Sequence, residues 1–441
     1  MAKYPSRRKL GTRKVAVHDV EHLRVHYDDH LYLYAPNRGG LWNFGDGELA
    51  VAYLAGPVDY KAPLPPGKPG PYRHCHPIAV RGARAGGALL SRSFDYGRTW
   101  PNNERSWIWH NDRSDNEILD WLRPRAPEQR EQIDLTQPDS IIHFCHGEYL
   151  RFPFGGRDLR NDPRLPPGIN FHLGRREHPP SFSLRSRDRG RTWERHATLI
   201  EGPSWAPEGG FLCVNLGHVQ FDNGVLGMVG ATYRRNVACF YASYDHGLSW
   251  QYVSEIARAA RTPDMYYGYS YLGVHRLPDA RLLCLMHRLP ENYPHVAFSE
   301  DDGMSWSAPR AIVSPATYNL PLTGPLPDRA PGDDSGPRYR SPRGLLLRDG
   351  RILVLFARRD YPARGGRGIL GVVSDDLGET WSEEFVVRDG AYCWDLGYPV
   401  VTELPDGRLF TAYWFTTKDG DEPVHERELV RYIAGTFFRL D

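Results

Sequence analysis

Pairs of short apolar segments separated by a tight turn recur along the whole chain. Segments such as 350–356 and 407–413 are rich in apolar residues that favour strands, and a turn precedes each of them. The pattern therefore predicts β-hairpins. Six such turns can be found, at Asp46-Gly47, His146-Gly147, Asn223-Gly224, Asp279-Ala280, Asp349-Gly350 and Asp406-Gly407.

An octet with Ser, Asp, Gly and Trp at fixed places recurs five times. The copies are Ser93–Trp100, Ser186–Trp193, Ser243–Trp250, Ser299–Trp306 and Ser374–Trp381. Ser and Asp side chains bond nearby backbone N–H groups, and Gly supplies the positive φ of a tight turn. We expect each Trp to be buried between neighbouring sheets. A catalytic residue is needed once rather than five times, so the octet aspartates are interpreted as structural.

Six hairpins and five octets predict an all-β fold, a six-bladed β-propeller of four-stranded antiparallel blades. The sixth blade would lack the octet because the ring closes there, with 428–434 pairing near 31–34. The whole chain, 1–441, is interpreted as one domain with insertions at about 57–86, 101–132 and 155–180 on the early blades. A capping box at Ser114 predicts a short helix from Asp115 to Leu122.

Composition narrows the classes of function. Hydrophobic residues make up 40% and charged residues 25% of the chain, as in a globular protein. The 55 Lys and Arg residues balance 54 Asp and Glu residues, which argues against nucleic acid as a partner. No apolar run is long enough to span a membrane, and the basic N-terminus lacks the apolar core of a secretory signal. Six scattered cysteines without a CxxC pair favour a reduced, cytoplasmic protein unless a signal has been removed. We expect no cofactor and no metal.

The five octets and six hairpins resemble the Asp-box repeats of the sialidase superfamily, over essentially the whole chain. The resemblance implies that the octets lie at the outer edge. It also implies a site at the channel mouth, where inner strands begin and second strands end. The residues eight positions before each hairpin turn are then expected at one rim: Arg38, Pro138, Asn215, Tyr271, Ser341 and Tyr398.

The resemblance also suggests roles for individual residues. Tyr398, in the matching segment 398–407, corresponds to the nucleophilic tyrosine of sialidases. Arg38 corresponds to the first of three arginines that bind the substrate carboxylate, although the family motif Arg-Ile-Pro reads Arg-Gly-Gly in this chain. For the other two arginines the candidates are Arg288, Arg367 and Arg358, with Arg340 and Arg343 as competitors.

The match to sialidases is less complete for the groups that transfer protons. Asp59 occupies the stretch that holds the acid/base in sialidases, and Asp139 is the alternative. Sialidases usually place a glutamate in blade four to deprotonate the tyrosine, but Tyr271 occupies that position, and Glu208 could substitute for it. A tyrosine without a base is a poor nucleophile at neutral pH.

These observations favour an exo-acting glycoside hydrolase on a carboxylate-bearing sugar, such as a sialic acid. Arginines would clamp the carboxylate bidentately, and Arg38 and Tyr398 would meet across the channel mouth. Two other functions remain open: a polysaccharide lyase acting on uronic-acid glycans, and a carbohydrate-binding propeller without catalysis. The expected partner is an acidic carbohydrate, with neither nucleic acid nor membrane, and the sequence does not specify an oligomeric state.

Overall fold

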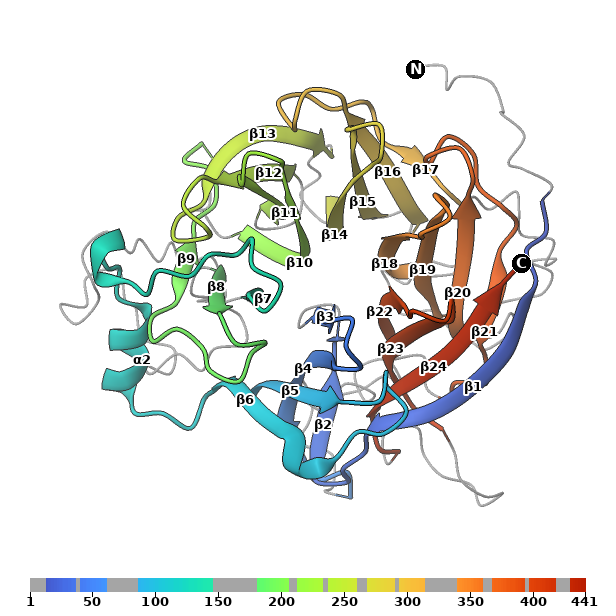
Figure 1. Ribbon diagram of the computed structural model, residues 1–441, viewed down its shortest axis with the longest axis horizontal. Coiled ribbons are helices and arrows are strands. Elements are labelled where there is room, and N and C mark those ends of the chain that lie inside the picture. Colours follow the sequence, from blue (N-terminus) through green and yellow to red (C-terminus); the bar gives the residue numbers. More distant parts are fainter. Residues whose placement is uncertain are drawn as a thin grey trace, which may run out of the picture.

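Six antiparallel sheets are arranged as blades around a central axis (Figure 1). This confirms the predicted all-β, six-bladed propeller. The computed structural model describes residues 13–36, 40–61, 86–145, 181–205, 212–232, 237–259, 268–289, 293–313, 339–359, 367–392, 396–417 and 429–441.

Blades three, four and five each have four strands that follow one another outward from the channel. Blade three contains β10 (Leu212–Gln220), β11 (Leu226–Thr232), β12 (Val237–Ser243) and β13 (Gln251–Arg258). Blade four contains β14 (Gly268–Arg276), β15 (Leu282–Leu289), β16 (Tyr293–Ser299) and β17 (Arg310–Ala311). Blade five contains β18 (Tyr339–Leu346), β19 (Ile352–Arg359), β20 (Arg367–Ser374) and β21 (Phe385–Arg388).

Blade one has an interrupted inner strand. It contains β2 (Leu31–Tyr34), β3 (Gly40–Asn43), β4 (Leu49–Pro57), β5 (Gly87–Ser93) and β6 (Arg105–His110). Leu31 pairs with Pro57 and Gly40 pairs with Ala52, so β2 and β3 share β4 as their partner. The segment 101–132, expected to be an insertion, therefore includes the outer strand of this blade.

Between blades one and two lies the helix α2 (Asp115–Leu122), which begins at the predicted capping box. The Ser114 N–H donates to Glu117 Oε2 (2.7 Å), and the Glu117 N–H donates to Ser114 Oγ (3.4 Å). Two short 3₁₀ turns, η3 (Asn102–Glu104) and η4 (Pro127–Gln129), lie on either side. In the described part of the chain, no helix is long and apolar enough to cross a bilayer.

Among the described residues, blade two has three strands: β7 (Ile141–Cys145), β8 (Ser181–Ser186) and β9 (Thr198–Ile200). Its hairpin turn precedes β7, so the prediction of that turn at His146-Gly147, which lie outside the described residues, was wrong. The Arg189 N–H donates to the carbonyl of Asp139 (2.8 Å), as the Tyr96 N–H donates to that of Gly47 in blade one (2.9 Å). Asp139 is therefore the counterpart of Gly47, and the rim position assigned to Pro138 was wrong too. A turn without glycine carries no strong sequence signal.

The two ends of the chain close the ring within blade six. β1 (Val17–His26) pairs with β24 (Tyr432–Leu440), followed inward by β23 (Leu409–Phe415) and β22 (Gly397–Glu403). The prediction that the last strand pairs near Leu31–Tyr34 was wrong, because β2 belongs to blade one. β2 is almost wholly buried, whereas β1 is mostly exposed, as suits an outermost strand.

The octets repeat one hydrogen-bond pattern. In each, the Ser hydroxyl donates to the Asp carboxylate, which also accepts from the backbone N–H and hydroxyl of the Thr or Ser four residues later. The expected burial of the Trp rings holds for Trp100 and Trp381, but Trp193, Trp250 and Trp306 are half-buried. Each octet packs on the preceding blade. The outer edge of the Trp ring therefore stays in contact with solvent.

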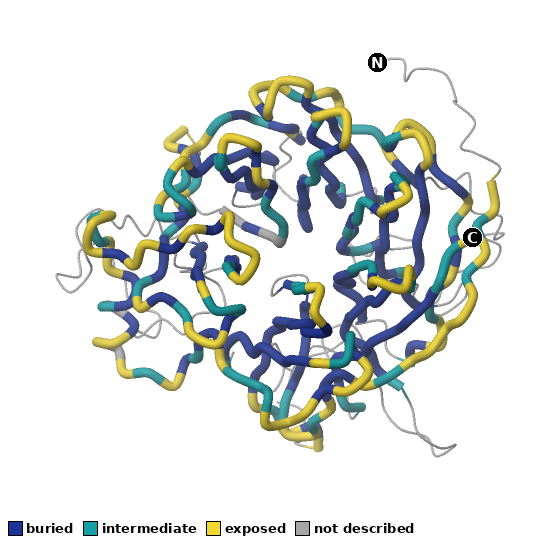
Figure 2. Tube along the Cα trace, in the orientation of Figure 1, coloured by how far each residue is buried: buried dark blue, intermediate teal, exposed yellow. Residues whose placement is uncertain are grey.

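Octet turns and hairpin turns lie at the same end of the ring, which we call the octet face. The opposite end, where inner strands begin and second strands end, is the mouth face. Buried residues are concentrated in the strands, and exposed ones in the connections (Figure 2). The middle strands are apolar nearly throughout because both faces of each blade are covered by neighbours.

Candidate active site

Three inner strands carry a bulge at the position eight residues before their hairpin turn. Tyr271, Ser341 and Tyr398 have φ values of 53°, 56° and 54°, a left-handed conformation that bulky residues rarely adopt. The pairing register shifts at the same places in β14, β18 and β22. A bulge re-aims the side chain of its residue. The equal offset that the sequence predicted is thus a shared backbone feature at the mouth end of three blades.

The bulges bring Tyr271 and Tyr398 together. Their hydroxyl oxygens lie 2.8 Å apart, and their rings meet edge to face with centroids separated by 5.1 Å. The blade between them carries Ser341 at the equivalent position, where its side chain is completely buried. The two phenols, from blades four and six, therefore meet across the intervening blade.

Aromatic and polar neighbours fix both phenols. The Tyr398 ring lies edge to face with Trp414, at 5.5 Å, and the Tyr271 ring lies 5.7 Å from the His287 ring. Ser270 Oγ is 3.1 Å from Nδ1 of His287. The two tyrosines are 8% and 9% exposed, so only a small edge of each reaches the channel mouth.

An arginine that sequence reasoning did not select contacts Tyr398. The Arg359 guanidinium carbon lies 5.3 Å from the centroid of the Tyr398 ring and 5.6 Å from that of Trp414, and its Nε donates to the Leu396 carbonyl (2.7 Å). The sequence prediction chose Arg358. Successive residues of a strand point to opposite faces, so Arg358 belongs to the other face of blade five. The alternation of side chains along the strand was the signal in the sequence that could have favoured Arg359 over Arg358.

The other predicted arginines occupy the mouth ends of their strands. Arg288, near the end of β15, pairs in register with Tyr269, two residues before Tyr271. Arg367 begins β20, is buried, and donates from its guanidinium to the Tyr392 carbonyl. Arg340 lies beside the bulge of β18. Arg38 lies outside the described residues, and so does its expected meeting with Tyr398.

The strands on which the Arg38 prediction rests are neighbours. β3 of blade one and β22 of blade six are joined by Asn43, whose Nδ2 donates to Thr402 Oγ1 (3.2 Å) and to the Glu403 carbonyl (3.1 Å). Asn43 stands three residues before its hairpin turn and Thr402 stands four before its own. The two strands therefore run side by side at nearly equal depth.

The predicted acids lie at opposite ends of the ring. Asp59 is exposed and follows β4 at its mouth end, and the Asp59 carboxylate accepts from the Lys61 N–H (2.9 Å). Asp139 lies at the octet face, where its carboxylate pairs with Arg189 Nε (2.7 Å). The structure does not bring Asp139 near Tyr398. Glu208 lies outside the described residues.

Basic side chains line the channel below the mouth. His218, His275 and Arg343 follow the inner-strand bulges of blades three, four and five. The Arg343 guanidinium packs against Gly217, where an added Cβ would lie only 2.8 Å from its Nη1, so Arg343 reaches across to blade three. Burial lowers the pKa of Arg343 to about 10, which leaves it charged at neutral pH.

The two channel histidines are neutral at neutral pH. Burial, and then the charge of Arg343, lowers the pKa of His218 to about 4 and that of His275 to about 3. The channel wall therefore carries the positive charge of Arg343, which favours anionic groups near the mouth. In the described parts of the chain, no three His, Cys, Asp or Glu side chains converge closely enough to hold a metal ion.

Comparison with known proteins agrees with this architecture. A family model described as "BNR repeat-like domain" matches residues 172–411, more than half of the chain. The chain belongs to the BNR repeat-like family. The fold of this propeller is similar to that of solved sialidases. No curated protein matches this BNR propeller by sequence.

Several solved structures share the fold of this BNR propeller. A protein of unknown function from Dyadobacter fermentans matches with a TM-score of 0.64 and 17% identity, over 96% of this chain and 99% of that one. The Hadza microbial sialidase Hz136 matches with a TM-score of 0.53 and 17% identity, over 92% of this chain and 65% of that one. A leech intramolecular trans-sialidase complexed with 2,7-anhydro-Neu5Ac matches with a TM-score of 0.52 and 15% identity, over 96% and 70%. At these identities the likeness shows the fold alone.

Proposed function

We propose that the protein is an exo-acting glycoside hydrolase that acts on a carboxylate-bearing sugar, with its reaction centre at Tyr398. The observation that carries this proposal is the hydroxyl pair of Tyr271 and Tyr398, held 2.8 Å apart by left-handed bulges at the channel mouth. Buried polar side chains in sparsely populated backbone conformations cluster at functional sites. The resemblance to sialidases, whose chemistry lies at this end of the ring, supports the proposal.

In this proposal Tyr398 attacks or stabilises the anomeric centre. A nucleophile that is uncharged in the resting site avoids repulsion from the carboxylate of the substrate. The nearby guanidinium of Arg359 favours negative charge on the Tyr398 oxygen as the bond forms. A hydrogen bond donated by Tyr271 to that oxygen acts in the same direction.

The remaining roles are carried over from the resemblance to sialidases. Arg38, Arg288, Arg358 and Arg367 are the candidates that clamp the substrate carboxylate, since a guanidinium pairs with it through two parallel hydrogen bonds. Asp59, exposed at the mouth end of blade one, is the candidate that protonates the leaving oxygen. The positive charge of Arg343 in the channel supports an anionic substrate.

A polysaccharide lyase is the second candidate, favoured by one observation. The hydrogen-bond partner of Tyr398 is a phenol rather than a carboxylate, and His287 lies beside that phenol. A tyrosine and a histidine can serve as the acid and base that remove and deliver protons in β-elimination, with an arginine neutralising the uronate carboxylate. A propeller that binds acidic sugars without catalysis is the third candidate.

A panel of fluorogenic acidic glycosides, including sialosides and uronides, tests the proposal. We expect release of the fluorophore from at least one acidic substrate and not from its neutral counterpart. Tyr398→Phe should reduce turnover by orders of magnitude and leave the affinity for substrate nearly unchanged. In parallel, incubation with uronic-acid polymers is followed by ultraviolet absorbance, because elimination creates a conjugated double bond.

Each result separates the candidates. Fluorophore release without new absorbance supports the hydrolase. New absorbance that Tyr398→Phe abolishes supports the lyase. Binding without either signal supports the non-catalytic propeller. An active Tyr398→Phe enzyme contradicts any mechanism centred on Tyr398.

A further inference from the structure

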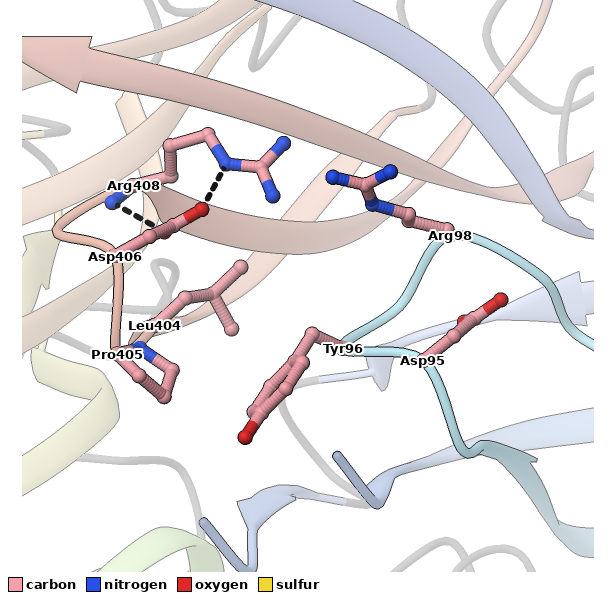
Figure 3. A pocket seen from close by; sticks show the side chains of 7 residues that line it. All are labelled: Asp95, Tyr96, Arg98, Leu404, Pro405, Asp406 and Arg408. Carbon is pink, nitrogen blue, oxygen red and sulfur yellow. Dashed lines mark hydrogen bonds and ion pairs between the residues drawn. The ribbon is translucent and has the colours of Figure 1, made fainter. Parts of the chain in front are cut away.

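A second pocket lies on the octet face, at the opposite end of the ring from Tyr398. It occupies the junction at which the octet of blade one meets the hairpin turn of blade six (Figure 3). Its volume is about 380 Å³, within the usual range for a small-molecule site. Its lining consists of Asp95, Tyr96, Arg98, Leu404, Pro405, Asp406 and Arg408.

Equivalent positions at two other blade junctions carry ion pairs. At each junction, the sixth residue of an octet faces a residue next to the hairpin turn of the preceding blade. That residue stands two positions after the first residue of the turn. Between blades one and two this pair is Arg191 with Glu48, at 3.0 Å. Between blades four and five it is Glu379 with Arg281, at 3.2 Å.

The junction of blades six and one breaks this pattern. The corresponding residues are Arg98 and Arg408, two like charges that line one pocket. Figure 3 shows their guanidinium groups extending toward each other over the cavity. Among the five octets, all of which the structure describes, this is the junction where two cations face each other. Two like charges that face each other repel, and an anion between them offsets that repulsion.

The carboxylates of the pocket are already occupied by local bonds. Asp406 Oδ2 accepts from Arg408 Nε (2.7 Å), which leaves the terminal nitrogens of Arg408 directed toward the cavity (Figure 3). The Asp95 carboxylate accepts from the Thr99 N–H (2.9 Å) and hydroxyl (2.7 Å). Arg98 is exposed, and no described carboxylate lies within ion-pair distance of its guanidinium.

The rest of the pocket suits a sugar ring. The Tyr96 ring forms one wall, and its hydroxyl donates to the Gly45 carbonyl (3.1 Å), which fixes the ring in place. Leu404 and Pro405 form the apolar wall opposite (Figure 3). An aromatic ring offers a flat apolar surface to the C–H face of a sugar, while guanidinium groups take its carboxylate.

We propose that this pocket binds an acidic sugar, with the sugar carboxylate between Arg98 and Arg408 and the sugar ring against Tyr96. The site is separate from the chemistry proposed at the mouth face. It is a second binding site, and it needs no catalytic residue.

Calorimetric titration of the full chain with D-glucuronate, D-glucose and inorganic sulfate tests the proposal. Arg98→Glu recreates the opposite-charge pair seen at the other junctions. We expect it to weaken glucuronate binding by about tenfold or more and to raise the melting temperature. The matched control is Arg187→Glu, the same charge change at an exposed octet position away from the pocket, which should bind like the original protein.

The outcomes are distinct. Binding of glucuronate but not glucose, lost in Arg98→Glu and kept in Arg187→Glu, supports the site. Equal binding of sulfate and glucuronate identifies an adventitious ion only and overturns the assignment to a sugar. Unchanged glucuronate binding in Arg98→Glu overturns the site itself. None of these results alters the proposal for Tyr398, because Arg98 lies at the opposite face.

Discussion

The hydroxyl oxygens of Tyr271 and Tyr398 lie 2.8 Å apart although their blades are not neighbours in the ring. Tyr271 belongs to blade four and Tyr398 to blade six, so the two phenols meet across blade five. A hydroxyl in place of the usual carboxylate changes what the pair can do. It can donate a hydrogen bond to a tyrosinate, but it cannot hold the proton of Tyr398 in the resting site.

Removing one hydroxyl of this pair should therefore change the pH dependence of catalysis. We expect Tyr271→Phe to lower kcat and to move the alkaline rise of kcat upward by about one pH unit, since a hydrogen bond to a charged group contributes about 1.5 kcal/mol. The readout is kcat and KM across pH on the substrate found in the glycoside panel. Tyr244→Phe, the same change at an exposed octet position, is the control. An unchanged pH profile in Tyr271→Phe would show that its hydroxyl plays no part in catalysis.

The small side chain of Ser341 should be required for the two tyrosines to meet. Ser341→Leu places a larger side chain at a fully buried position of the intervening blade, which we expect to disturb the alignment of the phenols at a cost of about 1–3 kcal/mol in stability. We expect a large fall in kcat, whereas Ser341→Ala should keep nearly full activity. Both variants are compared by kcat and by thermal unfolding, so that loss of fold and loss of alignment can be told apart. Full activity in Ser341→Leu is the result that excludes this packing argument.

The octet aspartates should contribute to stability and not to catalysis. Asp245 accepts from Ser249 N (2.9 Å) and Ser249 Oγ (2.6 Å), and Asp245→Ala removes both bonds. The expected loss is about 1–2 kcal/mol in the free energy of unfolding, with KM near its original value. Glu300→Ala, at an exposed position of another octet, should change neither quantity. Urea denaturation gives the first quantity, and a selective loss of turnover in Asp245→Ala would contradict the structural role.

Two glycines have the same φ of +89° but different surroundings. Substituting each by Ala separates the energetic cost of backbone strain from the cost of overpacking. An added Cβ at Gly303 would lie 2.3 Å from Phe240 Cε1, whereas at Gly350 it would have no neighbour within 4 Å. Gly350→Ala should therefore cost about 1 kcal/mol from the left-handed backbone alone. Gly303→Ala should cost about 1–3 kcal/mol more from overpacking. Equal unfolding free energies for the two variants would show that octet four can shift away from blade three.

Acid should destabilise the fold through its buried histidines. His26, His218 and His275 have pKa values lowered to about 4, 4 and 3 by burial, below the value of about 6.5 expected in the unfolded chain. Above pH 6.5 neither state binds these protons. As the pH falls from 6.5 toward 4 the unfolded state binds them and the folded state does not. Each histidine therefore removes about 1.4 kcal/mol of stability per pH unit over that window.

Urea unfolding at pH 7 and at pH 5 measures this effect. His275→Gln should flatten the dependence of the unfolding free energy on pH, because one titrating group is lost. His30→Gln, at a highly exposed position, should leave the slope unchanged. An identical slope in all three proteins would mean that His275 gains its proton in the folded state at its ordinary pH.

The parts of the fold that repeat could be predicted from the sequence. Ser243 and Asp245 recur with the same spacing in four other octets, and one geometry satisfies all five. The rim position of Tyr398 followed from the same regularity, because the inner strands of blades four, five and six bulge at a constant distance from their turns. Asp139 could not be placed this way, since its turn lacks glycine and the repeat is degenerate in blade two.

The site depends on features that spacing does not encode. Arg358 and Arg359 are adjacent in sequence, and only the face to which each points decides that Arg359 contacts Tyr398. The meeting of Tyr271 with Tyr398 depends on how far two side chains reach across an intervening blade. The outer strand β1 is polar and mostly exposed, so hydrophobic periodicity does not identify it as the partner of the last strand. The apolar segment 31–34 matches the pattern of a strand better.

The pairing of β1 with β24 has a consequence for synthesis on the ribosome. Blades one to five can each be completed by local hairpins as the chain emerges. β1 must wait, unpaired, until the strand Tyr432–Leu440 has been translated, because only that strand offers it a partner. Until then the side of blade one that faces blade six stays uncovered. The half-built ring therefore presents apolar surface to solvent or to chaperones for nearly the whole time of translation, and blade six, which carries Tyr398, is completed only with its last strand.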